Sequence, residues 1–460
     1  MWQSRGSSGK SPASEPGLVR TASGPDSPPT HSWASLAKTL RGQAGGGPKS
    51  RDMRRSDHST SRQADRPAAK GHLPSLSPTY QSRSEHPLRI LYIVNQTPCY
   101  AGIERVVDSV AEEIATNFNN KLDVSVLYLT AYEQVVDADH NYKVILKTDR
   151  ERLKMLWNVR QIIAKGAYDL VITPQVEPTT LFWLATIGLR QRMAMHLHGN
   201  PRLERRSLKA SVMFTIMKTL VLQRLAAVFG TSPRQLEIFK ADYPSAVPHI
   251  WLANPVRAFE PTPERSPSSD EPVCFVSVGR FDYQKGQDML IRAFAAFSKR
   301  RPNARLKLVG FGADEGMLRA LISELGLGES VSLEHYPDSP AIPLSLSDVY
   351  LSGSRWEGWS LAICEGLRFG LPVIAFDCDF GPSDIIVDER LGRLLPIDDM
   401  DGFVDAMIYY HDHIETERRH APYRANYIDR FSMSKVGRTH AEALESAATS
   451  IHKASVSDMT

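Results

Sequence analysis

The sequence predicts an α/β protein with two doubly wound parallel sheets. Short apolar runs rich in β-branched residues alternate with helical patterns, which is typical of a parallel sheet that helices cover on both faces. The alternation stops at a stretch rich in Pro, Ser and charged residues, 254–272, and then restarts. At 460 residues the chain also exceeds the size at which single cores usually stop growing, so two domains are expected.

Residues 1–86 are predicted to be a disordered tail. They are rich in Ser, Pro, Gly and Arg, and such a segment buries too little apolar area to offset the entropy of ordering. They also carry 13 Lys and Arg against 6 Asp and Glu, whereas the whole chain has a net charge of +3. We interpret the segment as a dispensable tail, or as a result of a start assigned too early, with Met53 as the alternative start.

The first domain is expected over residues 87–254. Its opening run, 88–96, has the length of a buried parallel strand, and a loop and a helical pattern over 103–115 follow it. Further strands are predicted at 122–129, 168–174, 192–199 and 226–232. Residues 255–271 form the predicted linker.

The second domain is expected over residues 272–431. Strands are predicted at 272–280, 304–312, 330–337, 348–354 and 371–376, with helices between them. A last helix, 432–455, is expected to pack back on the first domain. Ligands of such sheets bind at the carboxyl ends of strands, so we expect a site in a cleft between the domains.

Composition excludes several classes of protein. The small net charge implies no nucleic-acid partner. The four cysteines are scattered without a CxxC spacing, which favours a reducing, cytoplasmic compartment over a disulfide framework or a zinc site. No run approaches the roughly 18 apolar residues of a membrane span, and no secretory signal is evident.

Two cations follow the first strand of the second domain. Arg280 and Lys285 occupy the loop before a helix that begins near Gln287, so both lie at the strand's carboxyl end. Arg offers a planar fork and Lys a mobile point charge, a pair suited to a diphosphate. The alternative is two solvated surface cations.

Two glutamates lie on either side of a predicted helix start. Glu357 belongs to a loop, 355–359, Ser360 is the expected N-cap, and Glu365 falls in the second helical turn. The two carboxylates would not share one helix face, which favours contact with two ends of a ligand. Free N–H groups near Ser360 and Leu361 form an anion site between them. The alternative is a solvated loop acid and a helix-surface charge.

Two other motifs are less informative. The Gly-x-Gly after strand 304–312 lacks a correctly placed third glycine, and Asp314 and Glu315 at the helix start favour capping over phosphate binding. His196 and His198 are expected to face opposite sides of their strand end, which argues against a shared metal. His198 is the one expected to face the cleft.

Together these segments resemble the retaining glycosyltransferases of family 4, which have the GT-B fold. The resemblance covers about 88–450 and rests on the order of its motifs: AGIERVV, HLHGNP, WLANPV, GRFDYQKGQD, LVGFGADEG and SRWEGWSLAICEGLRFGLPVIAFDCDFGPSDII. It implies that Arg280 and Lys285 neutralise the diphosphate of a nucleotide sugar with the N–H groups of Ser360 and Leu361. Glu365 would hold the ribose hydroxyls, and Glu357 the hydroxyls of the transferred sugar.

The resemblance also implies roles for three residues elsewhere. Tyr336 would lie near the base, Gly102 would approach the phosphates, and His198 would lie beside the reacting sugar. One departure concerns the usual Gly-Gly pair of the first loop, which is Ala101-Gly102 here, so one residue fewer is free to adopt positive φ.

The activity implied is transfer of a hexosyl or N-acetylhexosaminyl unit, with retention, from a UDP sugar to a glycan or lipid-linked acceptor of a cell-envelope polysaccharide. No metal or other cofactor is implied, because cations and a helix start stabilise the leaving phosphate. The alternatives are a glucan or small-molecule glycoside synthase of the same fold, and an inactive nucleotide-sugar-binding partner.

The segment 202–225 mixes basic and apolar residues in a helical pattern. It would suit peripheral contact with the inner face of an anionic membrane. The alternative is a core-facing helix with a solvated basic side.

Overall fold

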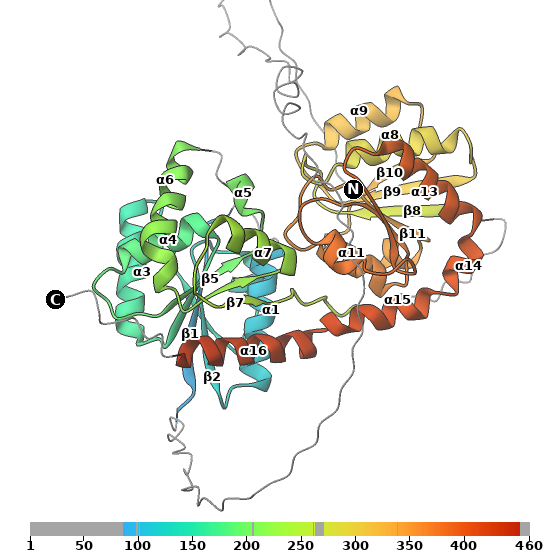
Figure 1. Cartoon of the computed structure of the whole chain (residues 1–460). Helices are drawn as coiled ribbons and strands as arrows, with labels where there is room; N and C mark the ends of the chain where they lie inside the picture. The colour runs from blue at the N-terminus through green and yellow to red at the C-terminus, as the bar shows by residue number, and fades with distance from the viewer. Residues whose placement is uncertain are drawn as a thin grey trace, which may run out of the picture. The chain divides into compact units, whose positions relative to one another are not determined.

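The structure of the chain is a computed structural model (Figure 1) that describes residues 86–97, 100, 102–204, 207–260, 262, 271–337 and 339–450. The predicted tail up to residue 85, the alternative start at Met53, Ala101 and most of the predicted linker lie outside the described residues.

The first sheet is parallel, with the strand order β3-β2-β1-β4-β5-β6-β7. Its strands are β1 Leu88–Val94, β2 Leu122–Tyr128, β3 Lys143–Leu146, β4 Leu170–Pro174, β5 Met193–Leu197, β6 Ala227–Gly230 and β7 His249–Trp251. The order reverses beside β1, as in doubly wound sheets. The short edge strands β3 and β7 are not among the predicted strands.

Alternating side chains of β1 show how helices cover both faces of this sheet. Ile90, Tyr92 and Val94 join one core with helix α1 (Gly102–Asn117). Leu91 and Ile93 join the opposite core. That core also receives α3 (Arg152–Gly166), α4 (Val176–Ala185), α6 (Leu208–Ile216) and α7 (Pro233–Asp242). Short helical segments complete the domain: α2 Glu133–Val136, α5 Pro201–Glu204, a π-helical turn Met217–Val221 and a 3-10 turn Leu222–Arg224.

The second sheet is also parallel, with the order β10-β9-β8-β11-β12-β13. Its strands are β8 Val273–Val278, β9 Ala304–Val309, β10 Val331–Glu334, β11 Val349–Ser352, β12 Val373–Phe376 and β13 Gly392–Leu395. Val349 and Leu351 of β11 face one core and Tyr350 faces the other. The predicted α/β class with two parallel sheets is therefore confirmed.

The helices of the second domain divide between these two cores. One core holds α8 (Gln287–Ser298), α9 (Glu315–Glu324) and α13 (Met400–Asp412), and the other holds α10 (Ala341–Ser345), α11 (Leu361–Arg368), α12 (Pro382–Ile385) and α15 (Ala421–Ile428). Helix α14 (Ile414–Arg418) connects α13 to α15.

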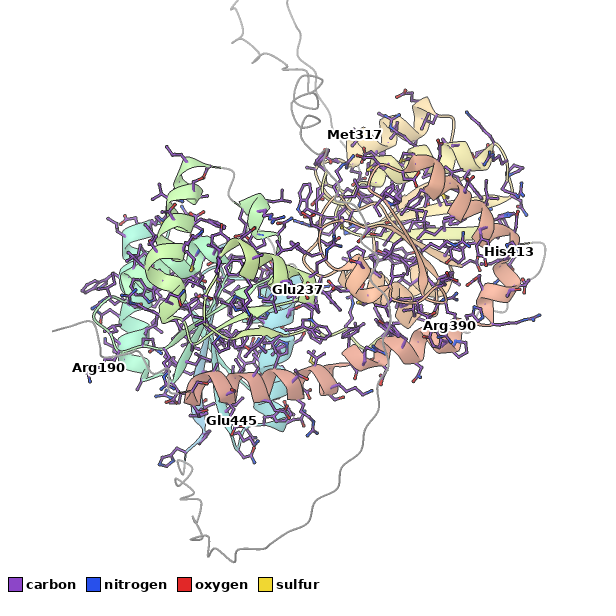
Figure 2. The ribbon with its side chains drawn as sticks, viewed as in Figure 1. Arg190, Glu237, Met317, Arg390, His413 and Glu445 are labelled. Carbon is purple, nitrogen blue, oxygen red and sulfur yellow. The ribbon has the colours of Figure 1, made fainter. Side chains whose placement is uncertain are left out.

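The last helix, α16 (Met433–Thr449), contributes mainly to the first domain, and Val436 near its start joins a core of the second. Ala441, Leu444 and Ala447 belong to the core that β1 and α1 share. Figure 2 labels Glu445 on α16, and its carboxylate lies 3.2 Å from the Lys121 ammonium. In the part of the chain that the structure describes, none of the helices has the length and hydropathy of a membrane span.

Candidate functional site

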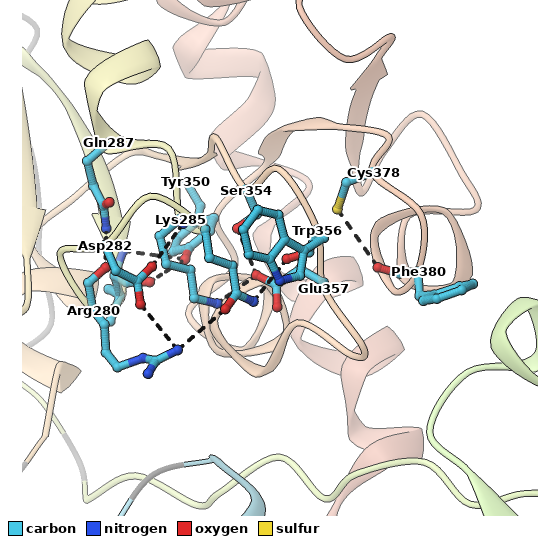
Figure 3. Close-up of polar contacts among 12 residues, drawn as sticks. Arg280, Asp282, Lys285, Gln287, Tyr350, Ser354, Trp356, Glu357, Cys378 and Phe380 are labelled. Carbon is cyan, nitrogen blue, oxygen red and sulfur yellow. Dashed lines mark hydrogen bonds and ion pairs between the residues drawn. The ribbon is translucent and has the colours of Figure 1, made fainter. Parts of the chain in front are cut away.

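Lys285 and Glu357 form an ion pair where β8 and β11 end. The Lys285 ammonium donates to Glu357 Oε1 at 2.6 Å, and the Ser354 hydroxyl donates to the same oxygen at 2.7 Å (Figure 3). The side chains of Lys285 and Glu357 are only 20% and 6% exposed. Since a buried carboxylate is costly without partners, these two bonds fix the position of Glu357.

Two glycines let the loops that carry this pair touch. Gly286 has φ +63°, a conformation that favours glycine, and a Cβ there would lie 2.0 Å from the carbonyl oxygen of Gly353. A Cβ at Gly353 would in turn lie 2.6 Å from the carbonyl oxygen of Gly286. Side chains at either position would therefore separate Lys285 from Glu357.

Arg280 lies outside this pair. Its guanidinium is 3.2 Å from Asp282 and 3.4 Å from Gln284 Oε1, and half of its side chain is exposed (Figure 3). The Arg280 carbonyl accepts a 2.8 Å bond from Gln287 Nε2, which ties the loop to the start of α8. The loop is thus fixed while the guanidinium remains accessible to an anion.

Helix α11 begins at Leu361 with Ser360 as N-cap residue, but the Ser360 side chain makes no capping hydrogen bond. The expectation that the Leu361 N–H is free is wrong, because this group donates to the Trp359 carbonyl at 3.1 Å. Ser360 lines a polar cavity of about 10 Å³ together with Lys285 and Glu357, about the space that one water requires. The structure therefore brings the helix start and the ion pair to one place.

Glu365 is buried on α11 and has a partner that the sequence pattern does not reveal. Arg257 Nε donates to Glu365 Oε1 at 2.7 Å, with side chains 27% and 7% exposed. Arg257 precedes Glu365 by 108 residues, and a single arginine near the predicted linker gives no signal of its role. Ser354 is also not among the predicted site residues, although its spacing three residues before Glu357 is a local signal.

The expectation that His196 and His198 face opposite sides is wrong. Their ring centroids lie 4.0 Å apart, because residues i and i+2 of a strand point to the same face. His440 of α16 lies behind them, with its ring 6.1 Å from that of His196. Among the described residues, no group of three or more His, Cys, Asp and Glu side chains has the arrangement of a metal site.

Burial keeps all three imidazoles neutral. It lowers the pKa of His198 to about 3 and the pKa of His440 to about 4, and it lowers the pKa of His196 well below its usual range. Neighbouring histidines lower the pKa of His196 and His198 further. At neutral pH His198 therefore offers a hydrogen bond rather than a charge.

The backbone at His198 touches the loop that carries Glu357. A Cβ atom at Gly358 would lie 1.9 Å from the His198 carbonyl oxygen, so only glycine fits there. Nearby, Asn200 Nδ2 donates to Asp379 at 2.6 Å, and the Ser232 hydroxyl donates to Asp384. These contacts hold the end of β5 beside the Glu357 loop.

Two polar residues that are not among the predicted ones, Gln175 and Glu204, lie near the turn after His198, where a Cβ at Gly199 would be 2.9 Å from Gln175 Nε2 and 3.8 Å from Glu204 Oε1. Gln175, between β4 and α4, has φ +61° and ψ 171°, a conformation that strains any residue except glycine. Its Oε1 accepts the His198 N–H at 3.3 Å. Glu204 is bound by the Val176 N–H, and burial raises its pKa to about 7. Backbone strain and burial of this kind leave no mark on the sequence pattern.

The structure also shows where Tyr336, Gly102 and Asp314 lie. Tyr336 follows β10, half-buried, and Gly102 begins α1 with open space around it. Within the described residues, the contacts of Lys285 and Glu357 include neither of them. Asp314 is the N-cap residue of α9 and Glu315 lies in its first turn, as expected, but the Asp314 side chain makes no capping hydrogen bond.

Comparisons with known proteins bear on the second domain most directly. Residues 259–426 match the family described as glycosyl transferases group 1. An uncharacterized glycosyltransferase of Methanocaldococcus jannaschii is 37% identical over 115 residues, which is 25% of this chain and 28% of that protein. The lipopolysaccharide 1,6-galactosyltransferase of Escherichia coli is 29% identical over 176 residues, which is 36% of this chain and 49% of that protein. The chain thus spans less than half the length of each.

A solved structure extends the likeness to both domains. HepE of Anabaena, in complex with UDP and glucose, has a TM-score of 0.65 and 17% identity, over 78% of this chain and 100% of that one. At this identity the likeness shows the fold alone, and the predicted GT-B fold is confirmed. The likeness to the glycosyl transferases group 1 family is confined to residues 259–426, in the second domain and the connection before it.

Proposed function

We propose that the chain is a retaining glycosyltransferase that moves a hexosyl or N-acetylhexosaminyl unit from a UDP sugar to a glycan or lipid-linked acceptor. The observation that carries this proposal is the buried Lys285–Glu357 pair at the carboxyl ends of β8 and β11, beside the start of α11. Support comes from the matched family, from the name of the Escherichia coli relative and from the UDP and glucose held by HepE.

The donor's diphosphate is assigned to Lys285, Arg280 and the start of α11. Departure of the nucleotide develops negative charge on the diphosphate, and fixed cations with a helix N-terminus stabilise that charge in the transition state. Lys285 is the held cation and Arg280 the mobile one, so Arg280 can close on the diphosphate after it binds. No metal is part of this proposal.

Sugar and ribose are assigned to the two glutamates. Glu357, fixed by Lys285 and Ser354, accepts hydrogen bonds from hydroxyls of the transferred sugar. Glu365, held by Arg257, accepts them from the ribose. His198 is neutral and lies beside the Glu357 loop, so it can bond to the sugar without attracting the leaving group. Retention, with the leaving phosphate as base for the acceptor hydroxyl, is carried over by analogy.

The acceptor is proposed to be an envelope glycan at the inner face of a membrane, with α6 as the contact. Leu208 of this helix is 85% exposed and Val212 is 48% exposed, and Leu220 of the following π-helical turn is 46% exposed. Apolar side chains flanked by Lys209 and Lys218 suit an anionic interface. Arg205 and Arg206 of the predicted basic segment lie outside the described residues.

A donor screen tests this function. UDP-, GDP- and ADP-linked hexoses and N-acetylhexosamines are added to the full chain, and thermal unfolding is followed. A ligand that binds only the folded state raises the melting temperature, and we expect this for UDP sugars. The stabilising donor is then incubated with the enzyme, and released UDP is measured together with the anomer of the product. Failure of every nucleotide sugar to raise the melting temperature contradicts the proposal.

A further inference from the structure

We propose that Arg257 is a positioning residue that aims Glu365 at the ribose of the donor. The inference rests on the proposed function, because it takes Glu365, the buried carboxylate of α11, as the group that accepts hydrogen bonds from the ribose hydroxyls. It adds a residue that comes from outside the second sheet and its helices, in the connection between β7 and β8.

The geometry leaves one oxygen of Glu365 available. Arg257 Nε binds Oε1 at 2.7 Å, a short charge-assisted bond. Among the described residues, no group pairs with the other carboxylate oxygen, Oε2, and none pairs with the terminal nitrogens of Arg257. Pairs of arginine with a carboxylate are frequently bidentate, with both oxygens engaged. Here a single bond fixes the direction of the Glu365 carboxylate and leaves Oε2 available to accept hydrogen bonds from a ligand.

Arg257 is itself held from two sides. Its guanidinium lies 5.1 Å from the ring centroid of Phe259, and that ring is 4.9 Å from Phe369 at the end of α11. On the backbone side, the Val256 N–H donates to the Phe431 carbonyl at 2.8 Å. The guanidinium is therefore fixed relative to the same helix that carries Glu365.

The bond to Glu365 predicts a specific effect on nucleotide recognition. A carboxylate that is aimed correctly binds ribose hydroxyls, so it favours a ribonucleotide over its 2′-deoxy form. Without Arg257, Glu365 loses its direction and its compensating charge, and it contributes less to this preference. A residue with only a structural role would change the affinity for both nucleotides alike.

The test compares UDP with 2′-deoxy-UDP by titration calorimetry, with the ADP and GDP pairs run in parallel. The proteins are the wild type, Arg257→Met, Arg257→Lys, Glu365→Gln and the control Arg368→Met. Arg368 lies on the same helix and pairs with Asp429 at 3.2 Å, so its loss matches the loss of an ion pair without touching Glu365.

We expect the wild type and Arg368→Met to share one preference for the ribonucleotide. Arg257→Met should weaken UDP binding by about tenfold, as expected for one charge-assisted bond, while 2′-deoxy-UDP changes less than twofold. Arg257→Lys should recover part of the preference. The ratio of the two Kd values does not depend on how much of a variant is folded.

Two results would overturn the inference. One is an unchanged Kd ratio in Arg257→Met, and the other is tighter UDP binding in that variant, which would make Arg257 a competitor of the ribose. Absence of binding by the wild type to every nucleotide contradicts the proposed function itself, and the inference falls with it. A wild type that binds UDP and 2′-deoxy-UDP equally refutes the ribose role of Glu365 but leaves the donor site standing.

Discussion

The Lys285 ammonium lies 2.6 Å from the Glu357 carboxylate in a place that solvent barely reaches. Loss of one partner leaves an uncompensated buried charge, which is more destabilising than loss of both. We expect Lys285→Met to lower the free energy of unfolding by about 3 kcal/mol and to abolish sugar transfer. Urea unfolding and release of UDP from the donor sugar measure the two effects.

The double variant Lys285→Met, Glu357→Gln separates structure from chemistry. It removes both charges, so most of the lost stability should return while transfer stays absent. If the double variant recovers neither, the pair does more for the fold than its two charges explain. If Lys285→Met alone keeps wild-type turnover, Lys285 does not bind the diphosphate.

A second prediction concerns the glycine that touches β5. The Cβ atom of Gly358→Ala would lie 1.9 Å from the His198 carbonyl oxygen, so the Glu357 loop and the end of β5 must separate. We expect transfer to fall by more than tenfold, because a displacement of this size misplaces reacting groups. Release of UDP from the donor sugar measures transfer, and urea unfolding shows whether the variant folds.

Gly316→Ala is the matched control for this change. Gly316 lies in α9 with nothing within 4 Å of its Cβ position, and a helical Gly→Ala replacement there should raise stability by about 0.5–1 kcal/mol. Equal transfer rates in the two alanine variants would show that the contact between Gly358 and His198 has no part in catalysis.

Whether a strand could be predicted from the sequence depends on how deeply it is buried. Strands such as β1 and β8 are predictable because both faces are buried, which requires a continuous apolar run. The edge strands β3 and β7 are short and partly exposed, so no such run marks them. Sequence position also locates Lys285 and Glu357, since each follows a predicted strand.

Contacts between residues that are far apart in the sequence could not be predicted from its pattern. Arg257 meets Glu365 across 108 residues, and its role emerges only from the folded path of the connection. The histidine pair shows another limit: the positions of His196 and His198 are evident, but their side chains share one face of the strand. Strain at Gln175 and the buried carboxyl of Glu204 are properties of the packed structure alone.

A third prediction follows from the buried histidines. Because the pKa of His440 is about 4 in the folded chain and 6.5 when unfolded, the unfolded state binds more protons between these values. Stability that is present above pH 6.5 is therefore lost as the pH falls. The share of His440 in that loss is about 2 kcal/mol between pH 7 and pH 5.

His440→Gln tests this share without touching the Glu357 loop. The histidine Nε2 lies 3.0 Å from the Ala253 carbonyl, and a glutamine amide can donate to the same oxygen. We expect the variant to lose less stability than the wild type between pH 7 and pH 5, measured by urea unfolding at each pH. An identical loss in both proteins means that His440 is not buried as a neutral imidazole.

The last prediction concerns Glu204, which makes stability fall, rather than rise, with increasing pH. Burial raises the pKa of Glu204 from 4.5 to about 7, so the folded state binds more protons than the unfolded state between these values. Stability therefore falls as the pH rises through this window. Glu204→Gln keeps the shape of the side chain without the charge, and it should match the wild type at pH 4.5. At pH 8 it should exceed the wild type by about 3 kcal/mol at most.

Urea unfolding of Glu204→Gln and of the wild type at pH 4.5, 6 and 8 measures this gain, and Glu315→Gln is the control. Glu315 lies on the first turn of α9, where its carboxylate pairs with Arg319 at 2.6 Å and is more exposed. Its replacement should bring no gain that grows with pH. A Glu204→Gln variant that is less stable than the wild type at pH 8 would show that the carboxylate is charged and well partnered in the folded chain, with the Val176 N–H among its donors.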